Sequence, residues 1–537
     1  MNDLAADVRA LAEARAARIK ALGQERGGRA DRASHWTDLT TVMLGSEFIA
    51  RTLSGNPDLL DKLDAAARPS DPKALRQQID DLRGDREEIG TALRRIRQEQ
   101  IVLLGWRDLV GKAPLSEVLE TLSTLADAAI DAALKCAHLE LVNRFGQPIG
   151  ENSGKPVQLT VLGLGKLGGR ELNMSSDIDL VFAYRENGST DGTQSISNHE
   201  FFIKLGQALI DILQTSTADG LVFRVDMRLR PNGDSGPLAL SFDAIDHYFL
   251  THGREWERYA LIKARPVAGD IASGMELLGS LRPFIYRKYL DFGAFESIRS
   301  MKTLIDRELA KKSLTGNVKL GRGGIREIEF IIQSHQLIYG GRNAALRTAS
   351  LYAALAALEE GGMLDRADGD RLRSHYDYLR VLEHRLQIMD DAQTHSIPVE
   401  PLARTRIALA MCYPDNVDFE SALASVNDDV HQLFRSVFHH HRGSLPDDQD
   451  SLFADLWDET LAPEDQLTQF TALGFQDPQQ VQTLLAGIRD SRFYQAFSRE
   501  GRERLDALMP LALKRCAQTE SPDTAISRVL FVIESIG

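Results

Sequence analysis

The 537-residue chain contains only three cysteines, Cys136, Cys412 and Cys516, and they lie far apart in the sequence. An odd and widely spaced set excludes a disulfide framework and a metal site built from cysteine pairs. Long apolar runs are also missing, because no window approaches the roughly 18 residues of a membrane-spanning helix. The charged N-terminus lacks the apolar core of a signal peptide. We therefore expect a cytoplasmic protein that makes no use of a membrane.

The sequence lacks an excess of basic residues as well. Its formal net charge is −14. A general nucleic-acid binder should show a basic excess or a basic stripe, so no nucleic-acid partner is expected.

What the chain does have is enough apolar residues, 43% of the total, for several domains with cores of their own. Helical periodicity dominates, and only the segment around 155–270 alternates strand and helix patterns. The predicted organisation is a helical region at 1–115, an α/β core at 116–270, a helical bundle at 271–443, an acidic linker at 444–458 and a small helical segment at 459–537.

A glycine-rich loop stands near the centre of this organisation, in VLGLGKLGGRELNMSSDIDLVFAY (161–184). A strand predicted at 157–162 leads into the loop, which contains Gly163, Gly165 and one cation, Lys166. Glycines let backbone N–H groups approach an anion closely, because no Cβ intervenes. The loop therefore predicts a phosphate-binding turn.

Two acids follow the loop at the start of a predicted strand, 177–184. The two-residue period of a strand points Asp177 and Asp179 to one face and Ile178 to the other. Neighbouring carboxylates repel each other, which favours a divalent cation between them. A phosphate loop followed by a metal-binding pair is typical of phosphoryl or nucleotidyl transfer.

Other interpretations of this stretch stay open. A P-loop is disfavoured because Leu167, without a hydroxyl, follows Lys166. Gly163–Gly168 fits the letters of a dinucleotide-binding loop, but the acids come too early and lie inside a strand. The least specific alternative is a surface turn followed by an exposed acidic strand.

A further strand is predicted from Phe223 to Pro231, with alternating charged and apolar residues. Its charged face carries an acid among three arginines: Arg224, Asp226, Arg228 and Arg230. The functional interpretation makes Asp226 a third metal-binding carboxylate and makes the arginines phosphate ligands. The alternative is a solvated edge strand.

Two helical stretches add candidate site residues. In a helix predicted at 252–265, Lys263 and Arg265 either add positive potential near the phosphates or pair with Glu255 and Glu257. A glycine-rich turn at 321–324 precedes a second predicted helix, which buries Ile325, Ile328 and Ile332 and whose N-terminus could bind an anion. Glu327 and Glu329 lie about 200° apart around that helix, so only one of them can face a given site.

Together, the segments 163–180, 224–237, 256–265 and 323–330 closely resemble the bifunctional glutamine synthetase adenylyltransferase/adenylyl-removing enzyme family. That family belongs to the polymerase-β-like nucleotidyltransferase superfamily. The resemblance implies a predominantly helical α+β fold, in which helical N- and C-terminal regions flank a nucleotidyltransferase core with a small mixed sheet. It places catalysis and the binding of Mg²⁺ or Mn²⁺ on Asp177, Asp179 and Asp226. Nucleotide and phosphate contacts are expected at Gly163, Gly165, Lys166, Ser176, Arg228, Arg230, Lys263 and Glu327.

The family has two nucleotidyltransferase domains, whereas this chain shows the loop-and-acids pattern once. The runs at 256–265 and 324–330 are similar to the N-terminal, adenylyl-removing domain. The resemblance therefore implies that phosphate releases AMP from a tyrosine of glutamine synthetase as ADP, in the regulation of nitrogen assimilation. It also implies PII-type signalling proteins as partners and glutamine as an effector. The alternatives are adenylyl transfer from ATP and a non-catalytic regulatory module.

Overall fold

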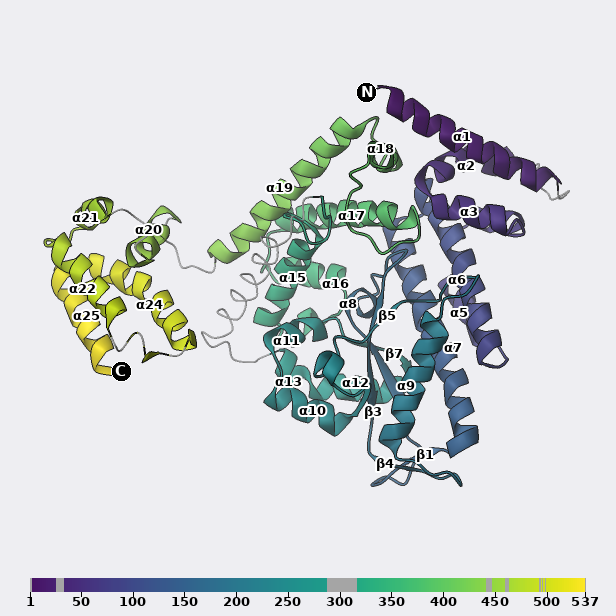
Figure 1. The fold of residues 1–537 in the computed structure, drawn as a ribbon, viewed down its shortest axis with the longest axis horizontal. Coiled ribbons are helices and arrows are strands. Elements are labelled where there is room, and N and C mark those ends of the chain that lie inside the picture. Colours follow the sequence, from purple (N-terminus) through teal and green to yellow (C-terminus); the bar gives the residue numbers. More distant parts are fainter. Residues whose placement is uncertain are drawn as a thin grey trace. The chain divides into compact units, whose positions relative to one another are not determined.

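The computed structural model describes residues 2–25, 33–286, 316–440, 447–458, 463–491, 494, 496–497 and 499–536. The chain divides into two compact units, Met1–Arg435 and Ser436–Gly537 (Figure 1). Helices dominate both units, and the sheet is small, which confirms the predicted mostly helical α+β fold. Within the described parts of the chain, no helix combines the length and apolar character needed to cross a membrane.

Helices open the first unit. They are α1 (Asn2–Glu25), α2 (Ala33–Gly45), α3 (Glu47–Gly55), α4 (Leu59–Lys62), α5 (Pro72–Asp80), α6 (Arg86–Leu109) and α7 (Leu115–Phe145), with a 3₁₀ turn at Leu63–Ala67. A capping box starts α6, because the side chains of Asp85 and Glu88 each accept a hydrogen bond from the other residue's backbone N–H. The long helix α7 begins directly after Pro114, which is its N-cap residue. It contacts α5, α6, α9 (Asn198–Gln214) and β7 (Arg265–Gly269), and so links the N-terminal helices to the sheet.

The main sheet is mixed and is built around β3 (Ile178–Tyr184). On one edge, β3 pairs antiparallel with β2 (Leu159–Gly163), which in turn pairs antiparallel with β7. On its other edge, β3 pairs parallel with two short strands, β5 (Val225–Asp226) at its start and β6 (Ala239–Ser241) at its end. A separate two-stranded sheet joins β1 (Pro148–Gly150) and β4 (Gly188–Thr190).

Both faces of the main sheet are covered, which explains the continuous apolar run in β3. Leu180 and Phe182 belong to the core that includes α7 and α9. Val181 and Ala183 point into a second core. Residues from the next helices contribute to that second core, namely α10 (Phe242–Thr251), α11 (Glu255–Leu261), α12 (Ile271–Ser280) and α13 (Arg282–Ile285). The start of β3, where Asp179 lies, is thereby fixed by packing from two sides.

The strand predicted from Phe223 to Pro231 is wrong in its extent, because only Val225 and Asp226 join the sheet. After Asp226 the chain forms a turn instead of continuing as a strand. The Arg230 guanidinium donates a hydrogen bond to the carbonyl of Met227, and Asn232 adopts a left-handed conformation with φ of 63°. The strand β7 was missed, because its first residue, Arg265, follows a helical pattern.

Further helices complete the first unit. They are α15 (Ile325–Tyr339), α16 (Leu351–Glu360), α17 (Arg366–Ile388), α18 (Pro401–Ala410) and α19 (Asn416–His440), the last of which continues past the unit's end. As predicted, α15 begins immediately after Gly324 and buries Ile325, Ile328 and Ile332. In Figure 1, α15, α16 and α17 form a group beside the glycine loop that carries α8 (Gly165–Gly168). The predicted helical character of 287–315 lies outside the described residues.

The second unit is a small helical bundle. Its helices are α20 (Asp447–Asp458), α21 (Pro463–Ala472), α22 (Pro478–Asp490), α24 (Arg499–Ala517) and α25 (Pro522–Ile536). The linker predicted over 444–458 is wrong for 447–458, because α20 buries Phe453, Leu456 and Trp457 in the core of this unit. Because acidic residues dominate the composition of this stretch, the apolar residues on one face of the helix were overlooked in the sequence.

Candidate active site

A cavity of about 370 Å³ lies at the start of β3, between the sheet and the helices that follow it. One wall, the sheet wall, consists of residues from the glycine loop, β3, β5 and the turn after β5. The opposite wall, the helical wall, consists of residues from α15 and from the segments around 319 and 393–395. The residues that line the cavity include Gly165, Lys166, Ser176, Asp177, Asp179, Asp226, Arg228, Lys263, Lys319, Glu329, Gln393 and His395.

The glycine loop touches the acids directly. The backbone N–H of Leu164 donates to the carbonyl of Asp179 at 2.9 Å. Gly165 has φ of +53°, and a Cβ at this position would lie 2.5 Å from Oδ2 of Asp179. Both the left-handed backbone and the close carboxylate therefore require glycine.

Asp179 and Asp226 are neighbours across the parallel pair of β3 and β5, where they are register partners. Register partners on adjacent strands present their side chains to the same face. Burial, together with the negative charge of Asp226, raises the pKa of Asp179 to about 6. Burial acts on Asp226 in the same direction, but hydrogen bonds from the side chain and backbone of Arg228 hold the pKa of Asp226 below its ordinary value.

Asp177 lies beside this pair and is held by two side chains. Its Oδ1 accepts a hydrogen bond from Arg224 Nε at 2.9 Å, and its Oδ2 accepts one from Gln393 Nε2 at 2.5 Å. Arg224 also donates to the backbone carbonyl of Ser175. The contact with Gln393 joins the first acid of the sheet wall to the helical wall.

The chemistry of these acids fits a hard divalent cation. Carboxylate oxygens are the ligands that Mg²⁺ and Mn²⁺ prefer. The raised pKa of Asp179 comes first from burial and then from the negative charge of Asp226, and a bound cation would offset both. Among the described residues, no group of three or more histidine, cysteine or acidic side chains is already arranged as a metal site. Asp177 and Asp226 are instead paired with guanidinium groups, Asp177 with Arg224 at 2.9 Å and Asp226 with Arg228 at 2.5 Å.

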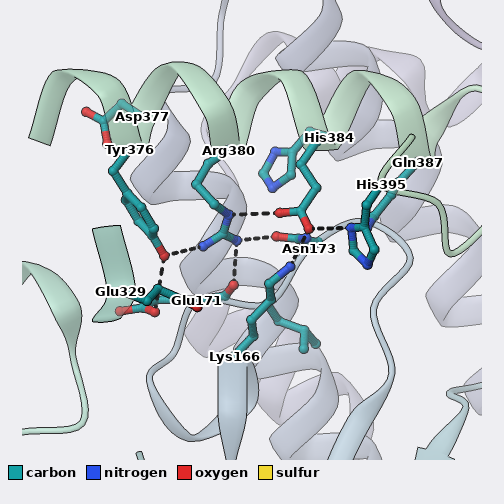
Figure 2. Close-up of polar contacts among 12 residues, drawn as sticks. Lys166, Glu171, Asn173, Glu329, Tyr376, Asp377, Arg380, His384, Gln387 and His395 are labelled. Carbon is teal, nitrogen blue, oxygen red and sulfur yellow. Dashed lines mark hydrogen bonds and ion pairs between the residues drawn. The ribbon is translucent and has the colours of Figure 1, made fainter. Parts of the chain in front are cut away.

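The helical wall is anchored by a buried charge network on α17. Lys166 Nζ lies 2.6 Å from Oε1 of Glu383, and His395 Nδ1 lies 2.8 Å from the same oxygen. Arg380 Nε lies 3.2 Å from the other oxygen, Oε2. Figure 2 shows the side chains of Lys166, Arg380 and His395 approaching the same carboxylate, that of Glu383, from three directions.

These contacts set the charge states of the network. Burial lowers the pKa of Lys166 to about 7, in spite of its contact with Glu383. Burial alone would raise the pKa of Glu383, but Lys166, His395 and Arg380 hold it well below its usual range. Glu383 therefore stays ionised and ties the cation of the glycine loop to α17.

Most of the predicted site residues reach the cavity. Ser176 and the three aspartates line it, as do Gly165, Lys166 and Arg228. Lys263 lines it too, but its Nζ pairs with Glu171 at 2.7 Å and Glu329 at 3.3 Å. Neither of the two roles suggested for Arg265 describes its contacts, because it pairs with Asp127.

The structure does not bring three of the predicted residues to the cavity. Gly163 is buried inside β2 against Val267. Arg230 donates to carbonyls of its own turn, and Glu327 faces His431 of α19 at 3.2 Å. Glu329 lies on the other side of α15 and lines the cavity in place of Glu327, because the two glutamates lie about 200° apart around the helix.

The cavity residues that were missed include Lys319, Gln393 and His395, and also Glu329, which was passed over in favour of Glu327. The bond from Val318 N–H to the carbonyl of His395, at 2.8 Å, holds the segments around 319 and 395 side by side. No motif links these distant segments, although the charged glycine-rich run before α15 was a usable signal for Lys319.

Comparisons with known proteins place the chain among relatives. Residues 36–280 match the family model described as glutamate-ammonia ligase adenylyltransferase, and residues 299–438 match the model described as GlnD PII-uridylyltransferase. The chain is 44% identical over 508 residues to a protein of Nitrosococcus oceani, and this match covers 93% of the chain and 52% of the relative. It is 42% identical over 549 residues to a protein of Pseudomonas aeruginosa, with 98% of the chain and 54% of the relative covered.

Both relatives are named bifunctional glutamine synthetase adenylyltransferase/adenylyl-removing enzyme. A third protein with that name, from Chromobacterium violaceum, is 46% identical over 452 residues, which is 84% of the chain and 49% of the relative. The chain thus spans about half the length of the curated relatives that it matches.

Proposed function

This chain belongs, over residues 36–280, to the glutamate-ammonia ligase adenylyltransferase family, and we propose that it removes AMP from a tyrosine of adenylylated glutamine synthetase. In this reaction inorganic phosphate attacks the phosphorus of the AMP group, and the products are ADP and free tyrosine. The fold around β3 would then be a polymerase-β-like nucleotidyltransferase core that works with Mg²⁺ or Mn²⁺.

The observation that carries the proposal is the register pair of Asp179 and Asp226 beside a glycine loop, at a cavity that also contains cations. When bound there, a divalent cation would neutralise charge on the transferring phosphate and on the leaving oxygen. Asp179 and Asp226 would hold it. Asp177 would join them by exchanging its contact with Gln393 for the metal.

The remaining cavity residues would bind and orient the substrates. The backbone of Gly165 and Lys166 would contact the phosphate of AMP, as expected for a glycine turn. Arg228 is well exposed beyond its pair with Asp226, and Lys319 lies on the opposite wall. These two cations would bind the attacking phosphate from both sides and align it with the bond that breaks.

A second candidate function is adenylyl transfer from ATP onto glutamine synthetase. It is favoured by the names of the relatives, which contain both activities. The removing activity is preferred because the runs at 256–265 and 324–330 resemble the removing domain.

Regulatory partners form a further part of the proposal. The match of residues 299–438 to a PII-uridylyltransferase model supports recognition of a PII-type protein. Glutamine as an effector follows from the family resemblance alone.

The test is to incubate the chain with AMP-modified glutamine synthetase and Mg²⁺, adding either phosphate or ATP. We expect ADP to form with phosphate, and loss of this product in Asp179→Asn. Modification of unmodified glutamine synthetase with ATP, and no ADP with phosphate, would favour the second candidate. Retention of activity by Asp179→Asn would contradict both.

A further inference from the structure

His395 occupies a position on the helical wall that the proposed metal chemistry does not use. It lines the cavity and is only 19% exposed. Its backbone is fixed by the bond from Val318, and Gln393, two residues earlier, donates to Asp177. The ring therefore belongs to a rigid segment that touches the acids of the sheet wall.

The orientation of the ring is set by Glu383. Nδ1 is buried and lies 2.8 Å from the Glu383 carboxylate, at ion-pair distance but without the geometry of a hydrogen bond. The opposite ring edge, with Nε2, is directed away from α17 (Figure 2). A carboxylate beside one nitrogen of a histidine orients the ring, which leaves the other nitrogen to exchange a proton with a substrate.

The charged groups around the ring come from every neighbouring element. Glu383 and Arg380 belong to α17, Lys166 to the glycine loop and Lys319 to the adjacent segment. Glu383 is ionised and contacts the ring directly, whereas the cations contact Glu383 or line the cavity. Histidine is also the side chain whose unperturbed pKa lies closest to neutral pH, as an acid catalyst requires.

We propose that His395 is the acid that protonates the tyrosine oxygen as it leaves, and that Glu383 positions it for this step. The proposal rests on the proposed phosphorolysis. The bond between phosphorus and the tyrosine oxygen breaks, and a bond between phosphorus and a phosphate oxygen forms. The proton given by His395 ends on tyrosine, the proton of the attacking hydrogen phosphate is lost to solvent, and solvent reprotonates His395, so that ADP and neutral tyrosine result.

The step addresses a difficulty of this reaction. A phenol with an unperturbed pKa of about 10 is a moderate leaving group, so a positioned acid accelerates its departure. General acid catalysis of this kind contributes about 10²- to 10⁴-fold. The contribution of general acid catalysis falls as the tyrosine hydroxyl becomes more acidic. A merely structural role for His395 would not produce this dependence on the leaving group.

The test compares His395→Gln with the wild type on two protein substrates. One is AMP-modified glutamine synthetase, and the other carries AMP on a fluorinated tyrosine of lower pKa at the same position. We expect about a 100-fold or larger loss of turnover with tyrosine and less than about a 10-fold loss with fluorotyrosine. Retained turnover of the second substrate also shows that the variant is folded.

A matched control exists elsewhere in the same unit, at a histidine whose side chain is 18% exposed. His375 makes an equivalent imidazole–carboxylate contact, with Nε2 2.6 Å from Asp429, and it does not line the cavity. His375→Gln is expected to keep both rates.

The outcomes separate the two proposals. Equal losses with both substrates, or no loss with either, would overturn the role of His395 while leaving phosphorolysis intact. A wild-type chain that forms no ADP from either substrate would instead overturn the proposed function.

Discussion

The two walls of the cavity treat buried carboxylates in opposite ways. On the sheet wall, the pKa of Asp179 is raised to about 6 by burial and by Asp226. On the helical wall, the pKa of Glu383 is held well below its ordinary value, although burial alone would raise it. The difference lies in the basic side chains, since Lys166, Arg380 and His395 all approach Glu383 within 3.2 Å.

The comparison separates two uses of a buried acid. Where the chain provides the compensating charge, the acid joins parts of the fold, as Glu383 joins α17 to the glycine loop. Where compensation is incomplete, as at Asp179, an added cation would relieve the repulsion between carboxylates. The predictions below test this separation by changing one wall at a time.

The largest expected effect is on catalysis, from Asp179→Asn. Loss of this carboxylate should reduce the proposed ADP formation by roughly 10³-fold or more, because in the proposed mechanism Asp179 holds the cation that stabilises charge in the transition state. The free energy of unfolding should stay the same or rise, since the change removes a buried carboxylate that is incompletely compensated. Activity assays and thermal melts check both results, and a strongly lowered melting temperature would contradict the comparison.

The opposite pattern is expected for Glu383→Gln. Removing this charge leaves Lys166 and Arg380 without their buried partner, which should lower the free energy of unfolding by about 3 kcal/mol. Glu276→Gln is the matched control, because its pair with Arg185 is exposed and should contribute less than about 1 kcal/mol. Chemical denaturation measures the two variants side by side. Equal, small effects would show that Glu383 is not structural.

A smaller effect is expected from Gly165→Ala. The new Cβ would press on the Asp179 carboxylate and displace it, which should slow turnover by about 10- to 100-fold. Gly154→Ala controls for backbone strain, because Gly154 also has positive φ, at +62°, but has no neighbour within 4 Å of its Cβ position. Kinetic assays should show a loss of turnover for Gly165→Ala but not for Gly154→Ala. Similar activity in the two variants would contradict a link between the loop and the position of the Asp179 carboxylate.

The smallest effect concerns pH. The pKa of Asp179 is 3.8 in its ordinary state and about 6 in the folded chain, so the folded state binds the proton more tightly. The ionised Asp179 carboxylate therefore lowers the free energy of unfolding, fully so above pH 6. This destabilisation decreases as the pH falls through 6 and the carboxylate becomes protonated in the folded chain. Relative to Asp179→Asn, the wild type should gain on the order of 1 kcal/mol between pH 7.5 and pH 5. Denaturation of both proteins at the two pH values measures this gain, and a constant difference would contradict it.

The sequence allowed the sheet wall to be predicted because its residues follow one another in periodic patterns. The alternation in 177–184 predicted β3, which begins one residue later, at Ile178, and Asp177 and Asp179 both line the cavity. The extent of the strand around Asp226 was wrong, because the partners of Arg228 and Arg230 lie within a turn rather than across a sheet.

The helical wall could not be predicted in the same way. Lys319, Gln393 and His395 meet only through packing between segments more than 70 residues apart in sequence. For α15, the helical period limited the choice to Glu327 or Glu329, but only tertiary contacts decide which one faces the cavity. Periodicity therefore identifies which residues share a face, and the fold decides what that face meets.

The central claim is that the sheet wall binds a divalent cation through Asp179. Calorimetric titration of Mn²⁺ into the wild type, Asp179→Asn and Asp234→Asn tests it directly, since Asp234 is an exposed acid in the turn that follows β5. We predict that the wild type and Asp234→Asn bind Mn²⁺, with release of protons at pH 6, and that Asp179→Asn does not. Equal binding by all three proteins would contradict the account.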